Sequence, residues 1–155
     1  MYSIDTSALI DGWVRFYPPE VFPALWERIE DLIVRELLVA SQSVFHEIEA
    51  GDDSLTEWVK THKEMFIEDC EDVQSKVRRI QDDWPNPVDF TRKLTGADLF
   101  VIGLAQVRGF AVVTGEKPTN NLSAPKIPDA CLHGGTRCLN LLQMIQEQGW
   151  RFSGR

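Results

Sequence analysis

Residues 1–10 read MYSIDTSALI, and this stretch decides the fold class. Residues 2–4 predict a very short strand, and Asp5 stands where that strand ends. The Asp-Thr-Ser run at residues 5–7 has side chains that suit the N-terminus of a helix. The apolar residues that begin at Ala8 predict that helix. The chain therefore opens with a strand, a polar turn and a helix.

The same alternation of strand and helix continues along the chain. Apolar residues between 21 and 33 recur at helical spacing, which predicts an amphipathic helix. The uniformly apolar run 37–40 suits a strand that is buried on both faces, and a helix that ends at Gly51 follows it. Residues 110–113, Phe-Ala-Val-Val, form the clearest strand pattern. Strands separated by helices predict an α/β fold with a parallel sheet covered on both faces, in three α/β/α layers.

The remaining patterns are mostly helical. Apolar stripes over 55–66 and 73–84 predict two helices, and residues 139–145 predict the last one. Residues 126–128 indicate only a short extended piece after a polar loop. We found no internal repeat and no linker, so we expect a single domain over residues 1–155.

Composition places the chain among ordinary globular proteins. It has 155 residues, of which 43% are hydrophobic and 26% charged. No apolar run is long enough to span a bilayer, and the N-terminus lacks the basic region of a signal peptide. The three cysteines would leave one unpaired in any disulfide scheme, which favours a reducing compartment. We therefore expect a cytoplasmic protein without a membrane partner.

The formal net charge of -8 at pH 7 constrains the function. A protein that binds nucleic acid through its phosphates normally presents a basic face. Either nucleic acid is not the substrate, or the acidic and basic groups are segregated for a purpose. A metal site built from carboxylates would account for part of the excess, and a basic partner could account for more.

Several carboxylates fall where a parallel α/β sheet places its working site, outside the carboxyl ends of the strands. Asp5 ends the first strand, and Glu116 lies just past the strand at 110–113. Asp98 sits in the first turn of the helix that feeds that strand, and Glu47 lies in the helix after the second strand. Carboxylate oxygens are ligands for Mg²⁺ or Mn²⁺. Such a metal can activate water and stabilise charge on a phosphodiester.

Four segments, taken in order, resemble the four motifs of PIN domains. Residues 4–9 (IDTSAL) are similar to the opening motif, and residues 43–48 (SVFHEI) to the second, which contributes a Glu. Residues 97–105 (ADLFVIGLA) resemble the third motif, an Asp at the head of an apolar helix. Residues 112–116 (VVTGE) resemble the fourth, a strand followed by Thr, any residue and Asp. The resemblance covers most of the chain.

The resemblance implies a three-layer α/β/α fold and cleavage of RNA that depends on Mg²⁺ or Mn²⁺. It also implies kinship with VapC-type toxins of bacterial toxin–antitoxin pairs, so the expected partners are an RNA substrate and a cognate antitoxin, with a homodimer as a further option. The catalytic and metal-binding residues that it implies are Asp5, Glu47, Asp98 and Glu116, and the substrate-binding residues are Ser7 and Thr114.

The sequence departs from the PIN pattern in two places. Glu116 stands where the family usually has Asp, which lengthens the side chain by a methylene. The segment between the second and third motifs is long and helical, so the surfaces for partner and substrate can differ from those of better-known members. These departures leave open a PIN-like binding module with a weakened metal site.

Each of the four acids also has a structural interpretation. Asp5 could cap the first helix, and Asp98 could be the acidic end of a capping box with Thr95. Glu47 could be a solvated helix residue, and Glu116 could be a loop acid that pairs with a neighbouring lysine. The metal interpretation is preferred because all four fit one constellation.

Two other functions are weaker alternatives. Cys131, His133 and Cys138 could ligate zinc, but they form no CxxC pair and have no clear fourth ligand. A phosphatase similar to the haloacid dehalogenases would also begin with an Asp after the first strand. That family needs a second Asp two residues later, where Ser7 stands in this chain.

Overall fold

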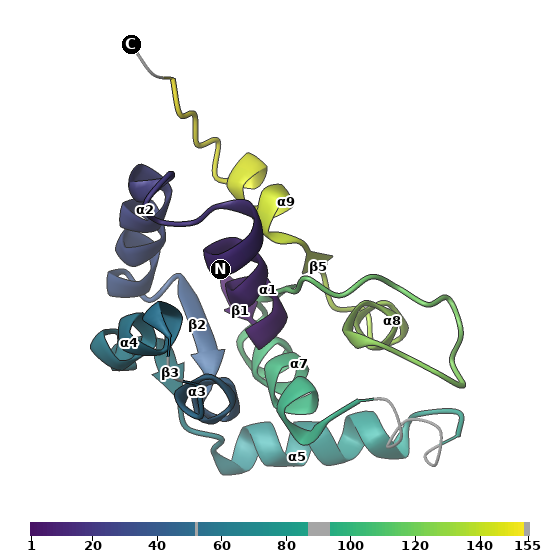
Figure 1. Cartoon of the computed structure of the whole chain (residues 1–155). Coiled ribbons are helices and arrows are strands. Elements are labelled where there is room, and N and C mark those ends of the chain that lie inside the picture. Colours follow the sequence, from purple (N-terminus) through teal and green to yellow (C-terminus); the bar gives the residue numbers. More distant parts are fainter. Residues whose placement is uncertain (52, 87–93, 154–155) are drawn as a thin grey trace.

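The computed structural model describes residues 1–51, 53–86 and 94–153, and within these residues five short strands form one sheet (Figure 1). The strand order is β3-β2-β1-β4-β5, and every neighbouring pair is parallel. The strands are β1 (Tyr2–Ile4), β2 (Leu38–Ser41), β3 (Phe66–Ile67), β4 (Ala111–Val113) and β5 (Cys138–Leu139). The predicted α/β fold with a parallel sheet is confirmed.

Helices connect these strands and cover both faces of the sheet. They are α1 (Thr6–Ile10), the π-helix η1 (Asp11–Phe16), α2 (Pro23–Val34), α3 (Gln42–Glu49), α4 (Ser54–Thr61), the 3₁₀ turn η2 (Lys63–Met65), α5 (Glu71–Asp82), α7 (Gly96–Arg108), α8 (Ile127–His133) and α9 (Leu141–Glu147). Among the described residues, no helix is long and apolar enough to cross a membrane.

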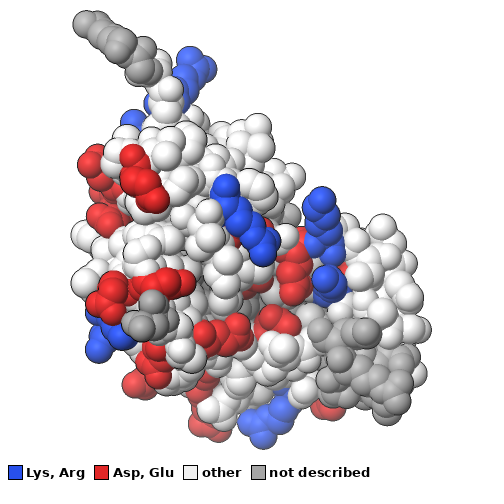
Figure 2. All heavy atoms as spheres, in the orientation of Figure 1, with Lys and Arg blue, Asp and Glu red and all other residues white. Residues whose placement is uncertain are grey.

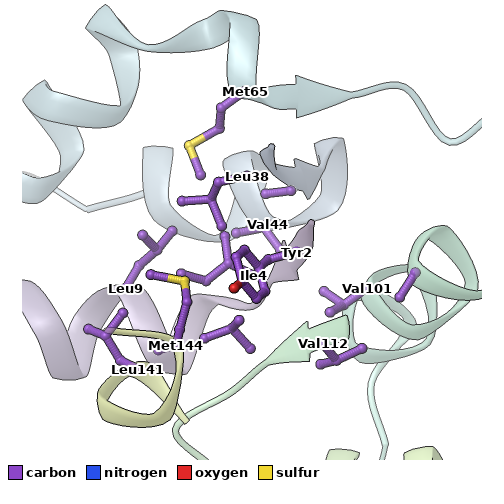
Figure 3. Packing of buried hydrophobic residues seen from close by; sticks show 14 of the residues in the cluster. Tyr2, Ile4, Leu9, Leu38, Val44, Met65, Val101, Val112, Leu141 and Met144 are labelled. Atoms are coloured by element: carbon purple, nitrogen blue, oxygen red, sulfur yellow. The ribbon is translucent and has the colours of Figure 1, made fainter. Parts of the chain in front are cut away.

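The two faces of the sheet are distinguished by the side chains of β1. Tyr2 points to α9, where its hydroxyl donates to Glu147 at 2.6 Å, whereas the Ser3 hydroxyl donates to the carbonyl of Val101 in α7 at 2.9 Å. Successive side chains of a strand point to opposite faces, so α9 and α7 lie on opposite sides of the sheet. Figure 3 shows Leu9 and Met144 on one side of β1 and Val101 on the other. The predicted three layers are therefore present.

All residues of β1, β2 and β4 are buried, as expected for strands of a covered parallel sheet. The apolar runs in the sequence identified these strands because burial on both faces leaves no room for polar alternation. In contrast, the two-residue strands β3 and β5 are not predicted by the sequence patterns, which place Phe66 and Leu139 on helical stripes. Two residues are too few to show a period, and only pairing with β2 and β4 defines them as strands.

Helix α8 was also missed, because its first residues had been interpreted as a short extended piece. It begins at Ile127 with Pro128 in its first turn, a position that proline tolerates because the N–H there needs no helical partner. Asp129 accepts a hydrogen bond from the backbone N–H of Lys126 at 2.8 Å and so caps the helix. The polar loop before it therefore ends in a helix.

The close packing of α5 on α7 gives a first testable prediction. A methyl group added at Gly103 would lie 2.9 Å from Cγ2 of Val77 and 3.4 Å from the carbonyl oxygen of Val73. Gly103→Ala should therefore lower the free energy of unfolding by about 1–3 kcal/mol, as measured by urea denaturation. A methyl group at Gly96, in the first turn of α7, would have no neighbour within 4 Å. Gly96→Ala should leave stability unchanged or raise it by up to about 1 kcal/mol, and equal effects of the two variants would contradict the packing argument.

Candidate active site

The candidate site lies where the order of strands in the sheet reverses. From β1 the chain continues to β2 on one side and later returns to β4 on the other side. Asp5 directly follows β1, and its backbone N–H donates to the carbonyl of Val113 at the end of β4, at 3.0 Å. Thr114 follows β4. In open α/β sheets, ligands usually bind at the carboxyl edge of the sheet, at the point where the strand order reverses.

Asp5 is the most buried acid at this edge, with 4% of its surface exposed. One carboxylate oxygen accepts the backbone N–H of Ala8 at 2.9 Å, and the other accepts the hydroxyl of Thr114 at 2.7 Å. The Ser7 hydroxyl lies 2.9 Å from both oxygens. Asp5 is thus the N-cap of α1, as the structural interpretation expected. The two predicted substrate-binding residues, Ser7 and Thr114, orient its carboxylate.

The surroundings of Asp5 change its proton affinity. Burial raises the pKa of Asp5, the hydrogen bonds from Ala8, Thr114 and Ser7 lower it, and the charge of Glu116 raises it again. The net result is a pKa of about 6, compared with an ordinary value of 3.8. Loss of solvent disfavours the charged carboxylate, and the donors compensate only in part. A cation next to Asp5 would relieve this cost.

Glu116 lies half-buried beside this acid. Its backbone N–H donates to the Thr114 hydroxyl at 3.1 Å, and its carboxylate accepts the backbone N–H of Ile127 at 2.9 Å. Burial raises the pKa of Glu116, the bond from Ile127 lowers it, and the charge of Asp98 raises it. Electrostatic coupling therefore links Asp5 to Glu116 and Glu116 to Asp98. Glu116 also ties the loop after β4 to the start of α8.

Asp98 has the role that the capping-box pattern predicted. Its carboxylate accepts the backbone N–H of Thr95 at 2.8 Å, while the Thr95 hydroxyl accepts the backbone N–H of Asp98 at 3.2 Å. The helix begins at the carboxyl edge of the sheet because α7 runs back toward the start of β4. Asp98 therefore caps α7 and adds negative charge near Glu116.

Glu47 lies outside this group of acids. It lies exposed on α3 and lines a separate hollow together with Thr6, Ile10 and Thr56. Among the described residues, no three His, Cys, Asp or Glu side chains are arranged so that they could hold a metal ion. The structure thus couples three of the four predicted acids electrostatically and leaves the fourth in the neighbouring hollow.

Sequence analysis did not select Asp11, which borders the same site. A methyl group added at Gly115 would lie 2.2 Å from Oδ2 of Asp11 and 3.1 Å from the carbonyl oxygen of Ser7. The side chain of Asp11 therefore packs against the backbone of Gly115, where no larger residue fits. Its other oxygen pairs with Arg15 at 2.8 Å. The only signal in the sequence was a Gly directly before Glu116.

Asp129 is a second acid that was missed, and it is 5% exposed. Its carboxylate accepts the backbone N–H groups of Thr119, Asn120 and Lys126 at 2.8–3.0 Å, and also the Thr119 hydroxyl. Burial raises the pKa of Asp129, but these hydrogen bonds outweigh burial and leave the pKa below its ordinary value. Asp129 fixes the loop that carries Glu116, so its role is to position the site.

A groove passes over Glu116 and is formed by two adjoining hollows of about 540 and 460 Å³. Glu116, Lys117 and Asn140 line both hollows. The first hollow extends along η1 and α9, and the second extends toward α8. Figure 2 shows acidic side chains on this face, with basic side chains beside the acids at its centre, over α1 and the segment that follows β4. Asp11, Arg15, Glu116 and Lys117 all line the first hollow, so acidic and basic groups lie together there although the whole chain is acidic.

Comparison with known proteins gives a family but no activity. A family described as "Domain of unknown function (DUF4411)" matches residues 2–152. The chain belongs to this family. No curated protein matches the sequence.

The acids of this edge carry the type of ligand atom that a hard divalent cation prefers. Asp5 and Glu116 offer carboxylate oxygens, the preferred ligands of Mg²⁺ and Mn²⁺, and burial raises the pKa of both acids. A cation would offset the cost of burying these charges and their mutual repulsion. In contrast, Cys131 and Cys138 are free thiols in α8 and β5. Within the described part of the chain, neither these thiols nor the carboxylates belong to a group of three side chains arranged to hold a metal ion.

Proposed function

We propose that this protein is an endoribonuclease that depends on Mg²⁺ or Mn²⁺ and hydrolyses RNA phosphodiesters at the carboxyl edge of its sheet. The observation that carries the proposal is Asp5, a buried carboxylate with a pKa of about 6 at the point where the strand order reverses. Perturbed acids in a crevice of this kind are typical of functional sites. The four motifs that resemble PIN domains supply the reaction class.

Each residue has a role in this proposal. Asp5 would hold the metal, and Ser7 and Thr114 fix the orientation of its carboxylate through their hydroxyl groups. Glu116 and Asp98 contribute further negative charge, with Glu47 from the neighbouring hollow. A bound metal would polarise a water molecule and stabilise the charge that develops on the phosphodiester. The raised pKa of Asp5 also means that this site attracts cations more strongly as the pH rises above about 6.

The proposed biological role is that of a toxin neutralised by an antitoxin. The support is the resemblance to VapC-type proteins together with the acidic character of the chain, whose net charge is -8. An antitoxin segment with a basic, amphipathic character would complement such a surface. We propose that this segment covers the groove and places an Arg or Lys near Asp5 and Glu116.

A binding module without catalytic activity is the second candidate. Two of the acids already accept hydrogen bonds from the backbone: Glu116 accepts the N–H of Ile127, and Asp98 accepts the N–H of Thr95. Acids that are engaged in this way can be retained for structure alone. This candidate predicts a protein that binds its partner but leaves RNA intact.

A cleavage assay separates the two candidates. Purified protein, free of any partner, is incubated with total cellular RNA and with Mg²⁺ or Mn²⁺. We expect RNA cleavage that stops on chelation and resumes when excess metal is added, because the site needs a cation to activate water. Intact RNA under all metal conditions would favour the binding module.

A further inference from the structure

We propose that the first hollow of the groove, on the η1 side of Glu116, binds single-stranded RNA by stacking an unpaired base on the aromatic pair Phe16–Tyr17. Lys117 contacts the phosphate that connects this base to the site. The inference rests on the proposed ribonuclease function and names the side of the site on which the RNA strand lies. The PIN-like motifs do not include Phe16.

Phe16 is exposed, and its neighbour Tyr17 is held in place by other residues. Phe16 is 61% exposed and lines the hollow with Tyr17, and their ring centroids are 6.4 Å apart in an edge-on arrangement. The ring of Tyr17 also packs edge-on against Phe22, at 5.6 Å. The carbonyl of Tyr17 accepts the indole N–H of Trp26 at 2.7 Å. Contacts with Phe22 and Trp26 therefore hold Tyr17, and Phe16 packs against its ring, so that Phe16 and Tyr17 form an aromatic platform beside the hollow.

The π-helix explains why this platform faces the groove. The backbone N–H of Tyr17 donates to the carbonyl of Gly12 at 2.9 Å, which is the wide hydrogen bond of a π-turn. A methyl group added at Gly12 would lie 2.7 Å from Cδ2 of Leu141, so the turn packs closely against α9. π-helices are rare and often mark functional sites. Here the wide turn places Asp11, Arg15 and Phe16 along one hollow.

A single exposed Phe is common on protein surfaces and needs no explanation. Phe16 differs because cations and hydrogen-bonding groups accompany it in the same hollow. Lys117 and Arg15 line that hollow, and Arg15 is paired with Asp11. Asn140 lies between the two hollows. Aromatic faces for bases together with cations for phosphates are the usual components of a binding site for single-stranded nucleic acid.

This arrangement also resolves the conflict between an acidic protein and a polyanionic ligand. The carboxylates at Asp5 and Glu116 repel phosphate, so RNA binding needs local cations and a contribution that does not depend on charge. Lys117 supplies a local cation at the point where the two hollows meet. Stacking on Phe16 supplies the contribution that does not depend on charge, since every base has an aromatic face. The second hollow, with Leu132 and Pro128 in its wall, continues the path beyond Glu116.

The test measures RNA binding separately from cleavage. All proteins carry Asp5→Asn, so that RNA remains intact, and binding of a labelled single-stranded oligoribonucleotide of mixed sequence is followed by fluorescence anisotropy in Mg²⁺. Phe16→Ala should weaken binding about tenfold or more, in keeping with the loss of one stacked base. The matched control is Phe152→Ala, because Phe152 is also exposed, at 45%, but lies outside the groove and contacts Arg28. This control should leave the affinity unchanged.

Two further measurements sharpen the result. Lys117→Gln should weaken binding and reduce the slope of log affinity against log salt by about 0.7, the value for one phosphate contact on a single strand. Lys60→Gln, which removes an exposed lysine paired with Glu57 on α4, should change neither. The same oligonucleotide in a duplex should bind without any effect of Phe16→Ala, because its bases are already stacked.

The outcomes distinguish this inference from the proposed function. If Phe16→Ala and Phe152→Ala bind single-stranded RNA equally well, the inference that a base stacks on Phe16 is wrong, even if the wild-type protein cleaves RNA. Loss of binding to a partner protein without any loss of RNA affinity would likewise overturn it and assign Phe16 to a protein interface. If only Phe16→Ala loses RNA affinity, the platform stands, even if no metal restores cleavage and the ribonuclease proposal fails.

Discussion

Asp5→Asn should abolish the metal-dependent cleavage of RNA and, without metal, raise the free energy of unfolding at pH 7.5 by about 1–2 kcal/mol. Catalysis is lost because the amide does not replace a carboxylate as ligand to a hard cation. Stability rises because the change removes a buried charge. Asn is also a good N-cap, so it can still accept the N–H of Ala8. Cleavage is followed on labelled RNA, and stability by urea denaturation in EDTA.

The pH dependence of this effect follows from the pKa of Asp5. The pKa in the folded protein is about 6 and the ordinary value is 3.8. The contribution of Asp5 to stability is therefore fully present below about pH 4 and is lost as the pH rises through about 6. Each pH unit corresponds to about 1.4 kcal/mol, which gives a loss of about 3 kcal/mol at neutral pH. Asp5→Asn avoids this loss but gives up the hydrogen bonds to a charged acceptor, so the net gain is smaller.

The stability difference between Asp5→Asn and wild type should thus shrink toward zero, or change sign, between pH 7.5 and pH 4. Mn²⁺ should raise the melting temperature of the wild type more than that of the variant, because a ligand that binds only the folded state stabilises it by mass action. Asp82→Asn, on the exposed side of α5, serves as control and should change neither quantity. Lower stability of Asp5→Asn at pH 7.5 with an intact Mn²⁺ response would show that Asp5 only caps α1.

The sequence predicted those parts of the fold that depend on long or strongly apolar segments. Residues 37–40 and 110–113 revealed their strands because burial on both faces requires uninterrupted apolar side chains. In β5 only Cys138 and Leu139 pair with β4, and the same apolar side chains also fit the helix that follows. Such short strands exist through pairing with a neighbour, which a single sequence does not reveal.

The same distinction applies to the candidate site. The rule that places ligands at the carboxyl edge selected Asp5 and Glu116, which the structure couples across β1 and β4. The position of Glu47 depends on how α3 rotates about its axis, and this rotation is set by packing. Asp11 reaches the site through a π-turn, which the sequence pattern does not show. The position of Asp129 relative to the site depends on the path of a loop whose polar residues fit many conformations.

The structural role of Asp129 leads to the largest expected change in stability. Asp129→Ala should lower the free energy of unfolding by about 3–5 kcal/mol, because it leaves the N–H groups of Thr119, Asn120 and Lys126 without their charged acceptor. Asp129→Asn keeps one acceptor oxygen and should cost roughly half as much. Both changes loosen the loop that carries Glu116, so cleavage should fall as well. Urea denaturation at pH 7.5 gives the stabilities.

The comparison with an exposed acid and the dependence on pH make this prediction specific. Asp82→Ala on α5 should alter stability by no more than about 0.5 kcal/mol. The pKa of Asp129 is below its ordinary value in the folded protein, so its stabilisation is present above the pKa of the unfolded chain and is lost as the pH falls through the folded pKa. The destabilisation caused by Asp129→Ala should therefore be smaller in acid than at pH 7.5. If Asp129→Ala were as stable as Asp82→Ala, the loop between β4 and α8 would not depend on this carboxylate, and the position of Glu116 would need another cause.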